Sequence, residues 1–461
     1  MGTLGRGDAM TTEEYRETQR SGRRRGIAAV AGIALLLTIP IGITGADSAG
    51  AAVSGIGATE PPEEPTCPPR IGTEGLPEHF GIETVGGDGV RASVVGGSLP
   101  PGMTLIDEAN YRFYHGIPTE PGSYGFRLQL SWVFDDDGPG SFADCLVEVK
   151  PAPVIHRLDA ADRYEEATLI AQEVAPGGAP LVYLASGEGF ADALSAASIA
   201  GARKAPLLLS TASSLPDSVR DELVRLGPAD VVLVGGENSL QPDLVTALES
   251  LPSAPRVHRV GGDDRFAVSA NLILHPQFGL PPTTSGQIYL ADGTKFPDAL
   301  SATPTAVMNG VPVLLIDGRM SRLAPEAREV IAALGSDELK MMGGDATISA
   351  DLAADLERRY GAIRRFGGAD RYDVSRRINQ STFSWALPRS NVYLANGESF
   401  PDALTGGALA GITEEPLFLV PGRCIPYRVA EHIGRLGPST ITLFGGRASL
   451  TDDVAALTVC P

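Results

Sequence analysis

Leu184-Ala-Ser-Gly-Glu-Gly-Phe-Ala-Asp-Ala-Leu194 decides the fold, because it returns as Leu290-Ala-Asp-Gly-Thr-Lys-Phe-Pro-Asp-Ala-Leu300 and Leu394-Ala-Asn-Gly-Glu-Ser-Phe-Pro-Asp-Ala-Leu404. An Asp-Arg-aromatic triplet precedes each copy and a Gly-Gly pair follows it, always in that order: Asp162-Arg163-Tyr164, Asp264-Arg265-Phe266 and Asp370-Arg371-Tyr372, then Gly235-Gly236, Gly343-Gly344 and Gly445-Gly446. The copies recur about every 100 residues, which is the size of a small domain and not of a solenoid unit. Three linked copies predict multivalent binding before they predict catalysis.

Short apolar strands alternate with helices through each copy. In the first copy we expect strands at 154–158, 181–184, 206–209 and 231–234, with helices between and after them. Continuous apolar strands that alternate with helices are typical of a parallel sheet covered on both faces, so the fold class is α/β. The repeats are assigned to 154–253, 254–355 and 356–461, and the short connections between them predict that they pack against one another.

Residues 67–150 have a different pattern of apolar and polar residues. Alternating apolar and polar residues in 124–132 and 145–149, with Gly and Pro between such runs, predict a small all-β domain with the architecture of a sandwich. Residues 52–66 are rich in Pro, Gly and Glu and are expected to form a linker.

The N-terminal 51 residues are expected to direct export. Five arginines between positions 16 and 25 precede an uncharged stretch at residues 26–46, and Ala49-Gly50-Ala51 offers a small-residue cleavage site. Residues 1–51 are therefore either a cleaved signal peptide, which Pro40 favours, or a membrane anchor, since 26–46 is about long enough to span a bilayer.

Charge and cysteine content limit the possible partners and the kind of site that the protein can carry. The net charge of −19 argues against nucleic acid as a partner, because nucleic acid requires a basic face. Four cysteines in an exported chain predict the disulfides Cys67–Cys145 and Cys424–Cys460, with four free buried thiols as the alternative. The six histidines do not recur in register and show no metal-ligand spacing, so we expect no metal, no cofactor and no catalytic residues.

Each recurring arginine is expected in the first turn of a helix, where the helix dipole disfavours a cation. Arg163, Arg265 and Arg371 therefore need partners, and bidentate ion pairs with Asp192, Asp298 and Asp402 are the natural expectation. Two interpretations remain open: a charged cluster that faces a ligand, or a structural clasp between repeats around a pseudo-threefold axis.

The Gly-Gly pairs also allow two interpretations. Each pair ends an apolar strand shortly before a helix, so its backbone N–H groups are candidates for binding an anion at the carboxyl edge of the sheet. The simpler interpretation is a tight turn.

Together these signatures resemble the cell wall binding repeat 2 family, over about residues 155–461. The resemblance implies Rossmann- or Toprim-like domains in a pseudo-threefold assembly, attached noncovalently to an anionic secondary wall polymer, teichoic-acid-like or other, in a Gram-positive envelope. It also implies that Pro-Leu-Leu segments lie near the polymer: Pro206, Leu208, Pro312, Leu314 and Pro416. The third copy departs at Phe418, and the first at Asp159-Ala160-Ala161, so the three sites are not expected to be equal. The segments 97–105 and 116–124 resemble bacterial immunoglobulin-like surface domains, which usually act as spacers.

The sequence thus predicts a noncatalytic protein that binds the cell wall through three repeats, at the cell wall or extracellular surface. An envelope enzyme such as a wall-polymer hydrolase is one alternative, and a purely structural or adhesive surface protein is the other.

Overall fold

The computed structural model describes residues 61–82, 90–108, 111–133, 139–281, 286–383 and 389–461. The signal peptide or anchor predicted at 1–51 and most of the linker lie outside these residues. Within the described part of the chain, no helix has both the length and the apolar content needed to cross a bilayer.

The N-terminal region is built from two β-sheets around one core. One sheet has the order β1-β7-β6-β3 and the other β2-β5-β4. Phe80, Met103 and Tyr114 of the smaller sheet pack with Phe126 and Leu128 of the larger one, as the alternating pattern predicts for a sandwich. The strands are β1 (Arg70–Thr73), β2 (Glu78–Gly81), β3 (Val90–Gly97), β4 (Met103–Glu108), β5 (Tyr111–Gly116), β6 (Gly122–Trp132) and β7 (Ser141–Lys150).

The three repeats form three four-stranded parallel sheets with helices between the strands, which confirms the α/β class. In the first repeat the elements are α2 (Arg163–Val174), β9 (Leu181–Ser186), α3 (Ala191–Ala202), β10 (Leu207–Ser210), α4 (Asp217–Leu226), β11 (Asp230–Val234) and α5 (Asp243–Glu249). In the second they are α6 (Arg265–Leu274), β13 (Gln287–Asp292), α7 (Pro297–Asn309), β14 (Val313–Ile316), α8 (Pro325–Ala333), β15 (Glu338–Met342) and α9 (Ala350–Tyr360). In the third they are α10 (Arg371–Thr382), β17 (Asn391–Asn396), α11 (Pro401–Ile412), β18 (Leu417–Val420), α12 (Tyr427–Leu436), β19 (Thr440–Phe444) and α13 (Asp452–Ala455).

The strand that opens each repeat belongs to the sheet of another repeat. β12 (Arg256–Val260) pairs with β11, and β16 (Arg364–Phe366) pairs with β15. β8 (Val154–Leu158) pairs in parallel with β19 of the last repeat and so closes the three repeats into a ring. The boundaries assigned from the sequence therefore do not coincide with the sheets. The first repeat, 154–253, contributes its first strand to the sheet of the third repeat, and its own sheet receives its fourth strand from the second repeat.

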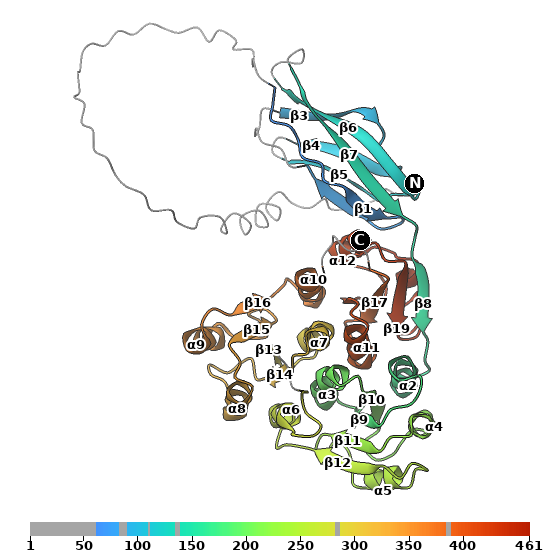
Figure 1. The fold of residues 1–461 in the computed structure, drawn as a ribbon, viewed down its shortest axis with the longest axis vertical. Coiled ribbons are helices and arrows are strands. Elements are labelled where there is room, and N and C mark those ends of the chain that lie inside the picture. Colours follow the sequence, from blue (N-terminus) through green and yellow to red (C-terminus); the bar gives the residue numbers. More distant parts are fainter. Residues whose placement is uncertain (1–60, 83–89, 109–110, 134–138, 282–285, 384–388) are drawn as a thin grey trace, which may run out of the picture. The chain divides into compact units, whose positions relative to one another are not determined.

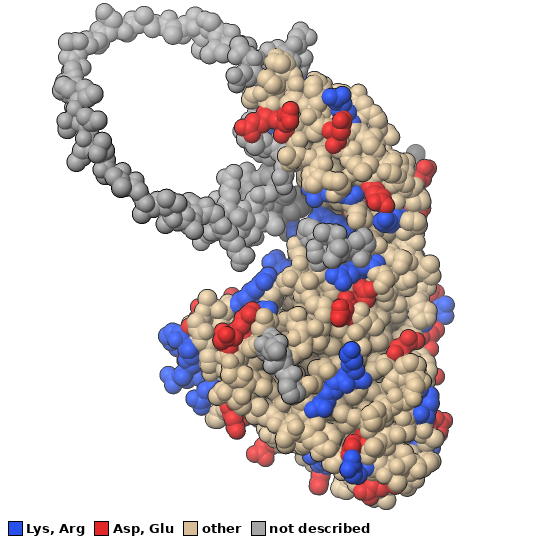
Figure 2. All heavy atoms as spheres, viewed as in Figure 1, with Lys and Arg blue, Asp and Glu red and all other residues tan. Residues whose placement is uncertain are grey.

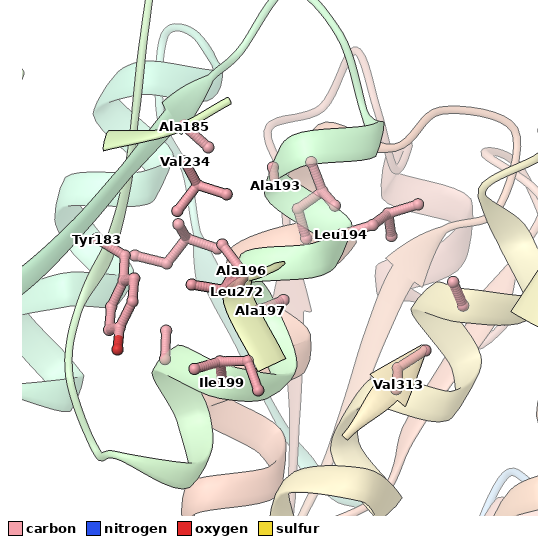
Figure 3. Packing of buried hydrophobic residues seen from close by; sticks show 14 of the residues in the cluster. Tyr183, Ala185, Ala193, Leu194, Ala196, Ala197, Ile199, Val234, Leu272 and Val313 are labelled. Atoms are coloured by element: carbon pink, nitrogen blue, oxygen red, sulfur yellow. The ribbon is translucent and has the colours of Figure 1, made fainter. Parts of the chain in front are cut away.

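The helices α3, α7 and α11 pack together at the centre of the repeats (Figure 1). They are rich in small residues, which allows their backbones to approach closely. One hydrophobic core includes residues of all three repeats, and Figure 3 shows Leu272 of the second repeat beside Ala196 and Ala197 of the first. Since the repeats share this core, they pack against one another as predicted.

Equivalent positions on the three central helices hold Gly201, Val307 and Gly411. A Cβ atom built on Gly201 or on Gly411 would lie only 2.4 Å from a side-chain atom of Val307. The packed centre of the ring therefore accommodates one valine side chain, and the other two copies of this position must be glycine.

Candidate functional site

The Asp-Arg-aromatic triplets begin the helices α2, α6 and α10. The side chain of the aspartate is the N-cap and accepts two backbone N–H groups in each copy. The arginine is then the first helical residue, as predicted. The carboxylate of the N-cap aspartate offsets the unfavourable position of a cation at this end of a helix.

Each recurring arginine joins two repeats. Its Nη1 donates to a glycine carbonyl of its own repeat: Arg163 to Gly187 at 2.5 Å, Arg265 to Gly293 at 3.0 Å and Arg371 to Gly397 at 2.6 Å. Its guanidinium lies over the ring of a phenylalanine from the neighbouring repeat: Arg163 over Phe400 at 5.5 Å, Arg265 over Phe190 at 5.4 Å and Arg371 over Phe296 at 5.8 Å. These cation–π contacts run in one direction around the ring.

The three phenylalanines meet one another at the centre of this arrangement. Their ring centroids are 5.8 Å apart for Phe190–Phe296, 5.9 Å for Phe190–Phe400 and 6.0 Å for Phe296–Phe400. All three rings are partly exposed. We call Phe190, Phe296 and Phe400, together with Arg163, Arg265 and Arg371, the aromatic platform.

The predicted ion pairs between the arginines and Asp192, Asp298 and Asp402 do not form. The carboxylate of each aspartate instead bonds to a hydroxyl that follows the Gly-Gly turn of its own repeat: Ser239, Thr347 or Ser449. Arg265 and Arg371, each from the next repeat, act on Asp192 and Asp298 through their charge. Burial raises the pKa of Asp192, and raises that of Asp298 to about 6, while Arg265 and Arg371 respectively oppose the shift.

The Gly-Gly turns are built to receive these aspartates. The first glycine of each pair has a positive φ, and a Cβ there would lie 2.4 Å from Asp192 Oδ2, 2.3 Å from Asp298 Oδ2 or 2.5 Å from Asp402 Oδ2. Backbone conformation and close approach therefore both require glycine at Gly235, Gly343 and Gly445.

The N–H groups of these first glycines are already used. Gly235 donates to the carbonyl of Val260, Gly343 donates to that of Phe366, and Gly445 contacts the Glu166 carboxyl. A recurring arginine on each opening strand also bonds a carbonyl of the turn: Arg157 to Gly445, Arg259 to Gly235 and Arg365 to Gly343. These contacts of the first glycines favour the tight-turn interpretation over an anion site, and the aromatic platform as defined above does not include Gly236, Gly344 and Gly446.

The Pro-Leu-Leu segments lie inside the molecule. Pro206, Leu208, Pro312, Leu314 and Pro416 are all buried, and Phe418 has no exposed surface. The proline carbonyls accept backbone N–H groups of the adjacent strands. We therefore exclude these side chains from the candidate site, because they offer no surface to a polymer.

The structure contains both predicted disulfides, Cys67–Cys145 and Cys424–Cys460. The described residues include no group of three or more His, Cys, Asp or Glu side chains arranged to hold a metal ion.

No local feature of the sequence marks the phenylalanines of the platform or the strand arginines Arg157, Arg259 and Arg365 as functional. Both sets recur in register, and that recurrence was the available signal. The phenylalanines lie inside the repeated motif, but the pattern alone could not show that three of them meet.

The comparison with protein families decides what the repeats are. The model for cell wall binding domain 2 matches residues 157–245, 259–353 and 365–455, which together are more than half of the chain. The chain belongs to the cell wall binding domain 2 family. Its three cell-wall-binding repeats are the three copies recognised in the sequence.

Two curated relatives come from Bacillus subtilis (strain 168). N-acetylmuramoyl-L-alanine amidase LytC is 25% identical over 301 residues, which is 65% of this chain and 57% of the relative. The amidase enhancer is 25% identical over 273 residues, which is 59% of this chain and 36% of the relative. The chain therefore spans less than two thirds of the length of these relatives.

Two solved structures share the fold. Cwp6 from Clostridium difficile has a TM-score of 0.58 and 18% identity, with 86% of this chain and 67% of that chain covered. Cwp8 from Clostridium difficile has a TM-score of 0.57 and 20% identity, with 73% and 59% covered.

Proposed function

We propose that this protein attaches noncatalytically to the bacterial cell wall and that the aromatic platform is where its ring of repeats contacts an anionic wall polymer. The protein then resides at the cell wall or extracellular surface. The all-β region, which we propose to be immunoglobulin-like, acts as a spacer.

One observation carries the proposal: three partly exposed phenylalanines and three arginines from different repeats converge on one site. The apolar face of a sugar ring packs well on an aromatic ring. An arginine has five N–H donors, and each of these three uses one for a glycine carbonyl, so donors remain for a carboxylate or phosphate of the polymer.

The platform also explains how an acidic protein can hold an acidic polymer. Lysines and arginines are interspersed with acidic residues on the face shown in Figure 2. At physiological salt a charge is screened beyond roughly 8 Å, so distant carboxylates repel the polymer weakly while the platform arginines act at contact.

The three repeats contribute loops of different charge to the aromatic platform. The loop that carries each phenylalanine holds Glu188 in the first repeat and Glu398 in the third, but Thr294 and Lys295 in the second. The second repeat therefore offers the least repulsion to an anionic polymer, and we expect it to contribute most to binding.

Purified cell walls, with and without extraction of the anionic polymer, provide the test. Replacing all three platform phenylalanines by leucine keeps an apolar side chain but removes the aromatic faces. We expect retention on unextracted walls to fall at least about tenfold, because linked weak sites lose avidity together. Phe142→Leu, which changes an exposed aromatic in the all-β region, is the matched control and should leave retention unchanged.

Thermal unfolding of the triple variant separates binding from folding. Retention that persists in a folded triple variant would refute the platform as the polymer site. Equal retention on polymer-free walls would refute the anionic polymer as the ligand.

A further inference from the structure

A polar cavity lies where the second and third repeats meet. Its volume is about 230 Å³, it opens to solvent, and it is lined by the second repeat's sheet and by the helices α7 and α10. We propose that this cavity binds one sugar unit that carries a single anionic group, a carboxylate or a phosphate. The inference rests on the proposed wall attachment, and it would make this junction the site that selects among wall polymers.

A row of three residues across the sheet distinguishes this junction. Tyr289, Lys340 and Arg364 are neighbours on the strands β13, β15 and β16. The equivalent row of the first sheet is Tyr183, Val232 and His258, and that of the third is Tyr393, Thr442 and His156. Only the second row carries two residues with a permanent positive charge.

Among the residues that the structure describes, aromatic side chains of the chain itself fill the equivalent space at the other two junctions. At the first junction the buried ring of Phe278 lies 4.5 Å from that of His258, and the Tyr183 hydroxyl donates to the Phe278 carbonyl. At the third, Phe444 stacks on Tyr393 with ring centroids 4.8 Å apart. At the second junction Met342 occupies the position of Phe444, and it lines the cavity.

The charges at the cavity favour an anion. The Lys340 ammonium lies 2.8 Å from Gln287 Oε1, 3.4 Å from Glu338 Oε1 and 5.2 Å from the centroid of the Tyr289 ring. The guanidinium of Arg364 lies over the Phe366 ring at 4.6 Å and forms no ion pair with an acid of the described residues. Two cations therefore face one half-exposed carboxylate, Glu338.

The remaining lining suits a hydroxylated ring. Hydroxyls of Thr305 and Thr382 lie 3.3 Å apart on opposite helices, and Asn309 Nδ2 donates to the Tyr289 hydroxyl at 2.9 Å. A cavity of about 150 Å³ holds a benzene ring, so 230 Å³ admits one six-membered ring with its substituents. Met308 and Phe366 supply apolar contact for the ring carbons.

Isothermal titration of the full chain with glucuronate, glucose 6-phosphate and glucose tests the inference. We expect at least one of the two anionic sugars to bind at least about tenfold more tightly than glucose, the effect of one charge-assisted contact. The variant Lys340→Val with Arg364→His copies the row of the first repeat and should lose that preference. Arg322→Gln with Arg328→Gln removes two exposed charges elsewhere on the second repeat and should keep it.

Single changes at the exposed Arg364 keep the test valid if the double variant does not fold. Arg364→His should weaken binding of the anionic sugar, and Arg364→Lys should largely preserve it. A wild-type chain that binds neither anionic sugar better than glucose would overturn the inference, and so would an unchanged preference in the folded double variant. If the wild-type chain prefers an anionic sugar but is not retained on walls, the cavity assignment stands and the proposed function fails.

Discussion

Single residues at the centre of the ring limit how the three repeats can differ. Gly201, Val307 and Gly411 are the same position in three copies, yet only Val307 has a side chain. The position cannot be optimised in one repeat without regard to the other two, which explains why copies of one domain have diverged here.

The variant Gly411→Val should lower the free energy of unfolding by about 1–3 kcal/mol, because it overpacks this centre. Adding Val307→Gly to the same chain should restore much of the loss, since one valine side chain is again present. Urea unfolding of the two single variants and the double variant measures this coupling. Additive losses would show that the two positions do not compete for the same space.

Glu166 is a second residue where the copies differ. It is buried at the closing junction, whereas the equivalent positions hold Val268 and Val374. Burial, together with the nearby Asp402 carboxyl, raises the pKa of Glu166 from 4.5 to about 10, so the folded protein holds this side chain neutral at pH 7.

The unfolded chain releases the Glu166 proton near pH 4.5 and the folded chain near pH 10, so stability must fall as pH rises between these values. The slope approaches about 1.4 kcal/mol per pH unit for one proton. Glu166→Gln should remove this part of the slope, and Glu166→Val should remove it while copying the other two junctions. Urea unfolding at several pH values checks this prediction, and parallel slopes for wild type and Glu166→Gln would contradict it.

At the scale of elements, the ring depends on strands exchanged between repeats. β12 and β16 lie in the middle of the chain and remain close to their partners in sequence. β8 is far in sequence from β19, so their pairing, which we call the closing seam, is held by noncovalent contacts alone. It includes two hydrogen bonds from Arg157, to the carbonyls of Gly445 and Leu450.

Arg157→Ala should therefore open the ring more readily than Arg259→Ala, its counterpart at the first junction. We expect a loss of about 1–3 kcal/mol in local stability at β8 and β19, the usual cost of leaving such partners unsatisfied. Hydrogen exchange followed by mass spectrometry would compare the closing seam with the equivalent seam between β11 and β12. Equal exchange at both seams in the two variants would show that closure does not depend on Arg157.

The strands and helices also show which parts of the fold could be predicted from the sequence. Apolar runs such as 231–234 predicted the strands and the parallel sheets, because strand pattern is local. The pairing of β8 with β19 is not local, and neither is the contact of Phe190 with Phe296 and Phe400. Both depend on how the three repeats close into a ring. The expected pairing of each Arg with Asp was wrong for the same reason: the aspartates found nearer partners in hydroxyls beside the Gly-Gly turns.

At the scale of the whole molecule, the three repeats share a hydrophobic core and pair strands with one another. Deleting residues 256–363 removes one whole period, so β16 takes the place of β12 after β11, and the central helix α7 is lost from between α3 and α11. We expect the shortened chain to lose far more than a third of its wall retention, because both its folding and its avidity suffer. Wall pull-down with circular dichroism distinguishes the two causes, and retention at two thirds of the wild-type level would argue for independent repeats.

The closing seam has a mechanical consequence. β7 leads through Pro151, Ala152 and Pro153 directly into β8, so a pull transmitted along the chain from the N-terminal region enters the ring at Val154. The load reaches the strand whose detachment would open the ring before it reaches any strand inside a single repeat. If the repeats are fixed to the wall, the pairing of β8 with β19 sets the tension that the attachment withstands. Under such a load, the pairing of β8 with β19 would be the first contact between repeats to break.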